Sequence, residues 1–466
     1  MNRTAWIAIG SNVGDRADNI QRALSLLKSK PGIVRVVQTS FLYETPPMYF
    51  EDQSSFLNAC AELLVNLEDP VGLMETLKIV ENEIGRFQTH TNGPRCIDLD
   101  LLFMNEDCIL NTSSCTVPHA RMQERFFVLT PLNDICPSFM HPVLLQTVSQ
   151  LHAHLLSVQG PDPCVRVFPL TKLGTVMPLN KSYVVGIVNV TPDSFSDGGL
   201  INNVNDFIDR VTDMIKDGVD IIDIGGESTR PNAELVSAEE EIKRVVNYIE
   251  CIRKQFPHIP ISIDTYKSTT ARLALAAGAN IVNDVSGGLL DQEMLPLVAE
   301  KGVGYMCMHA GRIGSHPPMD YGDNLSSVFV GENENVELAL PTMKSQLHSR
   351  VKASEDAGIY KWNIIVDPGL GFGKNSTINF AIVANLHAIC KPFPVMLGAS
   401  RKRFVRDVKH GREWKGNLDE ALVGTLAVTC SAKGASFYRV HDVSAIKRAL
   451  EIVDTISQLV DNKLVM

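Results

Sequence analysis

The sequence predicts a chain of mixed α+β and α/β class, in which an α+β sandwich is followed by a (β/α)8 TIM barrel. With 466 residues, the chain is longer than a single hydrophobic core usually supports. From residue 183 onward, eight short β-branched runs alternate with stretches long enough for helices, which is the pattern of such a barrel. Before residue 157, strand-like and helical stretches interleave without this strict alternation, which is typical of an α+β sandwich.

A cluster of chain-breaking residues, QGPDP at 159–163, separates the two patterns. We therefore predict one domain at 1–157 and a second at 163–466. The first is expected to be a ferredoxin-like sandwich, with strands near 5–12, 36–45, 57–67 and 97–104 and helices near 18–28 and 70–84. Residues 164–181 are expected to form a hairpin that caps the bottom of the barrel.

The eight runs of the second half end in residue types that are suited to chemistry. These ends are Asn189, Gly225 with Gly226, Asp264, Asn283, His309, Asp367, Ser400 and His441. A single Asp or Asn at such a place is more often a turn or cap residue. Because the carboxyl ends of barrel strands meet on one face, eight concurrent ends predict an active site there. Cys307 and His309 alternate on one run without further partners and are expected to be core residues rather than metal ligands.

Composition excludes several classes of protein. A net charge of −10 argues against a partner such as nucleic acid or a membrane surface, because binding to those polyanions needs concentrated basic side chains. No apolar run reaches the length of about 20 residues that crosses a bilayer. The ten cysteines form no CxxC pair, which favours reduced thiols. We expect a cytoplasmic protein, or one of the mitochondrial matrix if a presequence was removed.

The motifs of the second half resemble a known family. They are GIVNVTPDSFSDGG (186–199), DIGGESTRP (223–231), SIDT (262–265), NDVSGG (283–288), MHAG (308–311), DPGLGFGK (367–374), GASRKRF (398–404) and RVHD (439–442). In this order, and at successive strand ends, they resemble dihydropteroate synthase. That family joins 4-aminobenzoate to the pyrophosphate ester of 6-hydroxymethyl-dihydropterin and releases pyrophosphate.

The residue types fit this chemistry. Asp264, Asn283 and Asp367 offer carboxylate and amide groups for the donor and acceptor edge of a reduced pterin, where an unpaired group would cost about 1–3 kcal/mol. The resemblance adds Lys402 at the pterin, with Ser400 and Phe372 as further substrate contacts. Pyrophosphate gains negative charge as it leaves, so cations or a metal ion lower the barrier. Asn189, Arg439 and His441 fit this role together with one Mg²⁺, for which Asn189 is the expected ligand.

Two loops are expected to close over the barrel site, at 191–199 and 228–231. The resemblance implies that they help to form the aminobenzoate pocket through Phe195, Asp197, Thr229, Arg230 and Pro231.

The first half resembles 6-hydroxymethyl-7,8-dihydropterin pyrophosphokinase. The matching runs are AIGSNVGD (8–15), YETPPM (43–48), DQSSFLNA (52–59), EIGR (83–86), GPRCIDLDLL (93–102) and VPHARMQERFFVLTPL (117–132). Asp98 and Asp100 are two positions apart on a strand, so both point to one face and can bridge two Mg²⁺ ions on the triphosphate of ATP. Transfer of a phosphoryl group then needs positioning and charge neutralisation more than covalent chemistry.

The same resemblance implies further residues. Arg86, Arg95, His119 and Arg125 match family residues around the ATP phosphates, and Phe56 and Phe127 match the aromatic faces that hold the pterin, with edge contacts from Thr45 and Asn58. Gln88, Asn92 and Ala120 depart from the bacterial pattern around the ATP-site loop.

Together the two resemblances predict a bifunctional enzyme of folate biosynthesis, in which the product of the first domain is the substrate of the second. Its substrates are small molecules, and a homo-oligomer is expected, a dimer through the barrel. Two alternatives stay open. The barrel could belong to a methyltetrahydrofolate methyltransferase, although a methyl transfer has no pyrophosphate for Arg439 and His441 to hold. The chain could also be a non-catalytic pterin-binding protein, against which the retained Asp98 and Asp100 speak.

Overall fold

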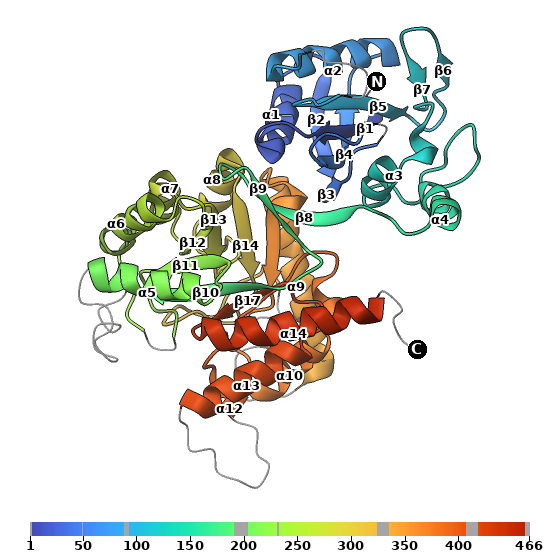
Figure 1. Ribbon diagram of the computed structural model, residues 1–466. Helices are drawn as coiled ribbons and strands as arrows, with labels where there is room; N and C mark the ends of the chain where they lie inside the picture. Colours follow the sequence, from blue (N-terminus) through green and yellow to red (C-terminus); the bar gives the residue numbers. More distant parts are fainter. Residues whose placement is uncertain are drawn as a thin grey trace. The chain divides into compact units, whose positions relative to one another are not determined.

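The computed structural model describes residues 2–48, 50–87, 93–190, 204–230, 233–323, 335–406 and 418–461. The chain divides into two compact units (Figure 1). The first contains Met1–Asn180 and the short segment Tyr360–Asn363, and the second contains Lys181–Ile359 and Ile364–Met466. No helix in the described part of the chain is long and apolar enough to cross a membrane.

The first unit is built on one antiparallel sheet of seven strands. Its strands follow the order β5-β1-β4-β3-β8-β9, and β2 pairs with β4 outside this path. They are β1 (Arg3–Ser11), β2 (Ile33–Thr39), β3 (Leu42–Thr45), β4 (Phe56–Val65), β5 (Asp98–Met104), β8 (Val165–Leu170) and β9 (Thr175–Pro178), and a separate two-stranded sheet joins β6 (Leu110–Asn111) to β7 (Thr116–Val117). The run at 36–45, expected as one strand, is divided between β2 and β3.

Helices cover both faces of this sheet. On one face, α1 (Arg16–Lys28) and α2 (Pro70–Ile84) pack apolar side chains such as Leu24 and Leu77 onto the strands. Asp15 and Asp69 cap the starts of these two helices by accepting hydrogen bonds from backbone N–H groups, as Ser, Thr, Asp and Asn commonly do. On the other face, α3 (Phe126–Asn133) and α4 (Val148–Gln159) bury a second apolar cluster.

The expected hairpin after the breaker cluster exists, but strand pairing places it in the first unit. Residues Leu42 to Glu44 of β3 pair antiparallel with Val165 to Val167 of β8, and β9 pairs with β8. Val167 lies in the same apolar cluster as the helices α1 and α2. The hairpin therefore extends the first sheet, because β3 would otherwise present an unpaired edge.

The second unit is an eight-stranded parallel barrel. Its strands follow the order β15-β14-β13-β12-β11-β10-β17-β16, and a bridge between Val366 and Val395 brings the two ends together. The strands are β10 (Tyr183–Asn189), β11 (Ile221–Gly225), β12 (Ile261–Asp264), β13 (Ile281–Asp284), β14 (Gly304–Met308), β15 (Ile364–Asp367), β16 (Met396–Leu397) and β17 (Phe437–Val440). All eight expected strands are present, so the predicted fold class is confirmed.

Helices surround this barrel (Figure 1). They are α5 (Val204–Lys216), α6 (Ala238–Gln255), α7 (Ser268–Ala277), α8 (Met294–Lys301), α9 (Val336–Asp356), α10 (Ser376–Ala384), α11 (Leu386–Cys390), α12 (Arg403–Arg406), α13 (Leu418–Ser431) and α14 (Val443–Asp461).

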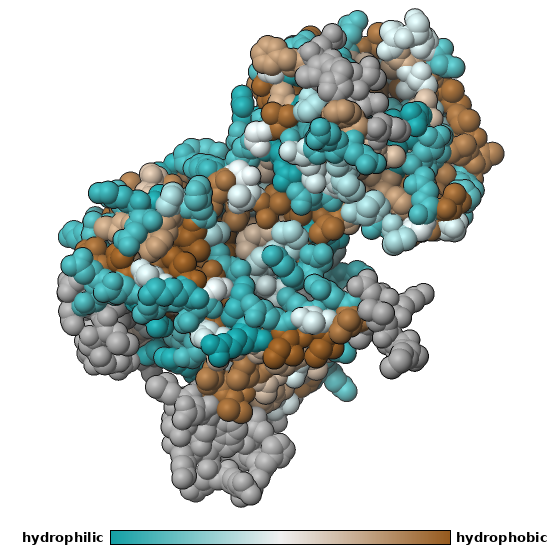
Figure 2. Space-filling view, viewed as in Figure 1, coloured by the Kyte–Doolittle hydropathy of each residue, from teal (hydrophilic) through white to brown (hydrophobic). Residues whose placement is uncertain are grey.

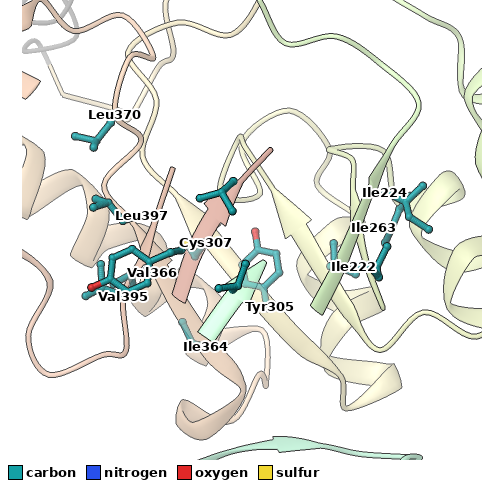
Figure 3. Close-up of a cluster of buried hydrophobic side chains, with 14 of the residues drawn as sticks. Ile222, Ile224, Ile263, Tyr305, Cys307, Ile364, Val366, Leu370, Val395 and Leu397 are labelled. Carbon is teal, nitrogen blue, oxygen red and sulfur yellow. The ribbon is translucent and has the colours of Figure 1, made fainter. Parts of the chain in front are cut away.

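Alternation along each strand separates an apolar layer from a polar interior. Ile222 and Ile224 of β11 belong to the large apolar cluster that includes residues of α6, and Figure 3 shows them beside Ile263 of β12. Asp223, between them, is fully buried and contacts polar side chains of other strands instead. Cys307 lies in the apolar layer, which confirms the expected core role. Polar side chains can therefore occupy the interior of the barrel, because the apolar residues of the same strands face the helices.

Candidate active sites of the two units

The first unit contains a cavity of about 220 Å³. Strands β1, β3, β4 and β5 line it, together with α3 and neighbouring loops. Its lining residues are Ala8, Ile9, Gly10, Thr45, Pro46, Met48, Gln53, Phe56, Asn58, Arg95, Asp98, Asp100, Arg125 and Phe127. Eight of the ten residues predicted for this site therefore line one cavity. The other two, Arg86 and His119, are not among the lining residues, but they interact with Asp98 and Asp100, respectively.

The two aspartates face this cavity from β5. They alternate with Ile97, Leu99 and Leu101, which are fully buried on the opposite face. Pairing with β1 sets Asp98 opposite Gly10 and Asp100 opposite Ala8, so only small residues stand beside the carboxylates. Burial raises the pKa of Asp100, and the nearby charge of Asp98 raises it further. Two neighbouring carboxylates repel each other when both are ionised. A divalent cation bound between them would offset this repulsion.

Arginines neutralise Asp98 in this arrangement. Arg86 Nη1 lies 2.7 Å from Asp98 Oδ1, and Arg95 Nε lies 3.3 Å from Asp98 Oδ2. Arg86 also pairs with the buried Glu81, whose Oε1 accepts a hydrogen bond of 2.7 Å from the backbone N–H of Leu99. Glu81, which the sequence analysis missed, thus ties Arg86 to the strand that carries both aspartates.

His119 follows β7 and interacts electrostatically with Asp100. Burial lowers the pKa of His119, while the charge of Asp100 acts in the opposite direction. The pKa of His119 therefore lies below that of a free imidazole even though Asp100 is close.

The apolar end of the cavity can hold a flat ring. Phe56 of β4 and Phe127 of α3 line it, and the guanidinium groups of Arg95 and Arg125 lie 5.2 Å and 5.5 Å from the centres of these two rings. At the same end, Asn58 Nδ2 donates a hydrogen bond of 2.7 Å to Thr45 Oγ1. Flat aromatic ligands favour such a combination of ring faces and a polar edge. Gln88 and Asn92 lie outside the described residues, and Ala120 is exposed.

In the barrel, strand register places the predicted polar residues in one row. Asn189 pairs with Gly225, Gly225 with Asp264, and Asp264 with Asn283. A Cβ atom on Gly225 would lie 3.5 Å from Asp264 Cβ and 3.6 Å from Asn189 Oδ1, so glycine keeps this row open. Asp367 ends β15 two strands away from Asn283, and its carboxylate accepts a hydrogen bond of 2.7 Å from Gly369 N–H.

Arg439 connects this row to a further aspartate, Asp223, that the sequence analysis missed. Arg439 Nε lies 2.7 Å from Asp223 Oδ2, and Nη2 lies 2.5 Å from Asp264 Oδ2. Asn283 Nδ2 is 3.3 Å from the same Asp223 oxygen. An acidic residue within the otherwise apolar strand IIDIG was the available signal. Burial raises the pKa of Asp264 to about 7, although the charge of Arg439 opposes this shift.

Two lysines lie beside Asp367. Lys402 Nζ donates to Leu370 O and lies 4.6 Å from the centre of the Phe372 ring, and burial lowers its pKa to about 8. Lys374 Nζ donates to the carbonyl groups of His309, Gly369 and Phe372 at 3.1, 2.9 and 3.3 Å. Burial lowers the pKa of Lys374 to about 7. Lys374 therefore stabilises the loop after β15 from inside, and Lys402 donates a hydrogen bond to the same loop at Leu370.

His441 differs from the cation that the sequence analysis expected at the pyrophosphate. Burial and the charges of Arg401 and Arg439 lower its pKa to about 3, so the imidazole is neutral at pH 7. Its Nδ1 lies 3.0 Å from Ser400 Oγ. His309, in contrast, is fully buried and bonded to Gln346 Oε1 at 2.9 Å.

Thr229 and Arg230 lie in the described loop after β11, whereas Phe195, Asp197 and Pro231 lie outside the described residues.

The residues present fit Mg²⁺ in the first unit. Asp98 and Asp100 offer carboxylate oxygens on one face of β5, and oxygen ligands of this kind suit Mg²⁺. Within the described ranges, no group of three or more His, Cys, Asp and Glu residues is placed to hold a metal ion. An ion on these two aspartates would therefore complete its shell with phosphate oxygens or water.

Comparisons with known proteins match a family to each unit. The family model for the pterin binding enzyme matches residues 185–441, and the model for 7,8-dihydro-6-hydroxymethylpterin-pyrophosphokinase matches residues 6–137. The chain is similar to the folic acid synthesis protein fol1 of Schizosaccharomyces pombe, with 38% identity over 462 residues that cover 98% of this chain and 59% of the relative. It is also similar to the mitochondrial folate synthesis bifunctional protein of Arabidopsis thaliana, with 37% identity over 96% of this chain and 82% of that protein.

A solved structure shares the whole fold. The crystal structure of wild-type Plasmodium falciparum HPPK-DHPS with pteroate superimposes with a TM-score of 0.74 at 21% identity and covers 98% of both chains. Taken with the motifs and the two sites, the matched family models and relatives establish that the chain belongs to the bifunctional folate synthesis family, whose members combine a 7,8-dihydro-6-hydroxymethylpterin-pyrophosphokinase with a pterin binding enzyme.

Proposed function

We propose that the chain carries out two consecutive reactions of folate biosynthesis. The first unit transfers pyrophosphate from ATP to 6-hydroxymethyl-7,8-dihydropterin, and the second condenses the product with 4-aminobenzoate to give 7,8-dihydropteroate and pyrophosphate. The observation that carries this proposal is the presence, in one chain, of the Asp98 and Asp100 pair in its cavity and the Asp264, Asn283 and Asp367 set inside the barrel. The chain spans 59% of the fol1 relative, so this assignment covers only the two units described.

In the first unit, the hydroxymethyl oxygen of the pterin attacks the β-phosphorus of ATP, and AMP leaves. Asp98 and Asp100 would hold two Mg²⁺ ions, which neutralise the triphosphate when bound. Arg86 and Arg95 now pair with Asp98, so nucleotide binding would transfer these arginines from the carboxylate to the phosphates. Phe56 and Phe127 would hold the pterin ring, while Thr45 and Asn58 contact its edge.

In the barrel, the amine of 4-aminobenzoate attacks the methylene carbon of the pterin pyrophosphate as the C–O bond to pyrophosphate breaks. Asp264, Asn283, Asp367 and Lys402 would pair with the pterin edge. A pterin that binds Asp264 would compete with Arg439 Nη2 for this carboxylate. The displaced Nη2 group could then bind the leaving pyrophosphate. Asn189 ends β10 in the same row and would hold one Mg²⁺ with the pyrophosphate. Thr229 and Arg230 stand on the loop that is proposed to cover 4-aminobenzoate.

The test is a single incubation of the full chain with hydroxymethyl-dihydropterin, ATP, Mg²⁺ and 4-aminobenzoate, followed by mass spectrometry. AMP and dihydropteroate are expected together, and omission of 4-aminobenzoate should leave AMP and the pterin pyrophosphate. AMP without dihydropteroate, when pterin pyrophosphate accumulates, would refute the proposed role of the barrel. The absence of AMP would refute that of the first unit.

The oligomeric state and the compartment belong to the same proposal. A homodimer through the barrel is supported by the exposed apolar side chains Ile452, Ile456 and Leu459, which lie on α14, where apolar residues gather in Figure 2. Sedimentation of the full chain and of an Ile452→Asp, Ile456→Asp variant tests it, and a monomeric parent chain would refute it.

We propose a cytoplasmic location, with the mitochondrial matrix as the alternative favoured by the plant relative, and cell fractionation distinguishes the two.

A further inference from the structure

Ser400 and His441 form a close pair at the carboxyl ends of two neighbouring barrel strands. Ser400 lies just after β16, and His441 is the first residue after β17. Ser400 Oγ lies 3.0 Å from His441 Nδ1 and 3.2 Å from the backbone nitrogen of His441. Ser400 is buried, with 7% of its surface exposed. The hydroxyl group therefore meets the histidine at both its backbone and its ring.

The hydrogen count of this pair selects one arrangement of protons. A serine hydroxyl has one hydrogen to donate and two lone pairs that accept. The backbone N–H of His441 donates to one of these lone pairs. If Nδ1 also carried a proton, it would donate to the second lone pair, and the hydroxyl hydrogen would have no acceptor among the described residues. Because a buried donor without an acceptor costs about 1–3 kcal/mol, the hydroxyl donates to Nδ1 and the ring proton stays on Nε2.

Burial and the surrounding charges keep the ring in this neutral form. Arg210 Nη2 donates to the carbonyl oxygen of His441 at 3.2 Å, and Arg401, Arg439 and Arg230 add further positive charge around the ring. The carboxylate of Asp442 lies 3.2 Å from Arg401 Nη2, so this acid is paired with the arginine. A second proton on His441 is strongly disfavoured in this setting, and its Nε2–H is left as a hydrogen-bond donor.

We propose that Ser400 is a positioning residue that fixes His441 as the Nε2–H tautomer, so that the neutral ring donates a hydrogen bond to an oxygen of the diphosphate group. This inference rests on the proposed function of the barrel, in which a diphosphate leaves the pterin. The ring contributes a fixed donor, and the positive charge comes from the neighbouring arginines. A donor that is aimed before the reaction stabilises the developing anion without reorganising.

The experiment has two independent readouts on the full chain. Two-bond ¹H–¹⁵N correlation spectra of ¹⁵N-histidine protein report the tautomer of His441, whose signals are assigned by their loss in His441→Asn. Calorimetry with inorganic pyrophosphate reports the anion site. We compare the parent chain with Ser400→Ala, with Ser400→Thr, which keeps the hydroxyl, and with Ser431→Ala, which removes an exposed serine of α13 as a control.

In the parent chain, Nδ1 should appear unprotonated and Nε2 protonated. Ser400→Ala should mix the two tautomers and weaken pyrophosphate binding about three- to tenfold, the loss expected for one hydrogen bond. Ser400→Thr should restore both readouts. If Ser400→Ala unfolds, Ser400→Cys, whose thiol is a weaker donor, should give an intermediate tautomer ratio.

Two results would overturn the role of Ser400. One is a parent chain with a protonated Nδ1, and the other is a Ser400→Ala variant that keeps both the Nε2–H tautomer and the parent affinity for pyrophosphate. A parent chain that shows the expected tautomer but binds no pyrophosphate would refute the anion site of the proposed function instead. The two failures are thus distinguishable.

Discussion

At the scale of single residues, both sites show carboxylates that are paired with arginines before any substrate arrives. Asp98 contacts Arg86 and Arg95, and Asp264 contacts Arg439. Such pairs cost desolvation, and removing one partner leaves an uncompensated charge. Under the proposed function, a pterin that binds Asp264 would release part of the Arg439 guanidinium for pyrophosphate, and Mg²⁺ that binds Asp98 would release Arg86 and Arg95 for the phosphates of ATP.

Replacement of Asp98 by alanine should separate the two activities. One remaining carboxylate cannot hold two cations against the triphosphate, so AMP formation should fall on the order of a hundredfold to a thousandfold. Condensation of supplied pterin pyrophosphate should be unchanged, because the barrel has its own site. Both rates are measured on the same preparation, with Asp107→Asn on the exposed turn after β5 as the control. Near-normal AMP formation by Asp98→Ala would remove Asp98 from the metal site.

Pterin binding to the barrel should be strongest between about pH 7 and pH 8. The pKa of Asp264, which burial raises to about 7, means that its acceptor charge appears as pH rises through this value. The pKa of Lys402, which burial lowers to about 8, means that its positive charge is lost above that value. Titration of pterin pyrophosphate from pH 5.5 to 9.5 tests this. The acidic limb should vanish in Asp264→Asn, the alkaline limb should move upward in Lys402→Arg, and Asp217→Asn should change neither. A flat profile for the parent chain would contradict the prediction.

At the scale of elements, the loop between β15 and α10 shows how a short segment is held in place for function. Lys374 lies inside this loop and donates to three backbone carbonyl groups, from His309, Gly369 and Phe372. Gly369 has a φ of 65°, and a Cβ atom there would overlap His309 O, so only glycine allows this close approach. The loop thereby aligns Asp367 at its start with Phe372, whose ring lies beside Lys402.

Lys374→Met should loosen this loop. The three carbonyl groups would lose their buried donor, so we expect a loss of at least about 2 kcal/mol in the free energy of unfolding of the barrel, together with weaker pterin binding. Chemical denaturation and pterin titration provide the two measurements, with the exposed Lys433→Met as the matched control. Equal stability of Lys374→Met and Lys433→Met would show that the loop does not depend on this lysine.

At the scale of the whole molecule, the two units are not simple consecutive pieces of sequence. Tyr360–Asn363 belongs to the first unit, although it lies between α9 and β15 of the barrel in the sequence. Trp362 is almost fully buried in the apolar cluster of the first unit, together with Leu24 and Val167. The first unit therefore depends on residues that are encoded about 180 positions after its main segment ends.

Trp362→Ala should destabilise the first unit selectively. Loss of a buried tryptophan costs about 3–5 kcal/mol, which exceeds what a domain of this size can easily absorb. Heat inactivation, followed separately by AMP formation and by condensation, should show the first activity failing at a lower temperature than in the parent chain. The exposed Leu273→Ala on α7 is the control. An equal decline of the two activities would refute the assignment of Trp362 to the first unit alone.

A fragment of residues 181–466 should still condense pterin pyrophosphate with 4-aminobenzoate, because a complete barrel carries its own core and site. It leaves Trp362 without its cluster, so a Trp362→Ser version should be more soluble. A fragment that begins at residue 164 should aggregate more, because β8 would lack its partner β3. Soluble but inactive fragments, beside an active full chain, would show that the barrel needs the first unit for activity.

The sequence by itself determined the fold class, the eight barrel strands and eight residues that line the cavity of the first unit. Strand periodicity and the chemistry of strand ends are local signals, so Asp98 with Asp100 and Asp264 with Asn283 were visible as candidates. Asp223 and Glu81 were not, because Asp223 acts through an arginine 216 positions later in the sequence, and Glu81 acts by joining Arg86 to the backbone of strand β5.

Only the tertiary structure decided three further points. The hairpin at 165–178 pairs with the edge of the first sheet at β3, and Trp362 packs in the apolar cluster of that unit. The protonation of His441 depended on burial and on arginines from one helix, one strand and two loops, whose combined field no local pattern reveals. Pairing partners, cavities and electric fields arise between segments that are far apart in the chain, and these properties exist only once the chain has folded.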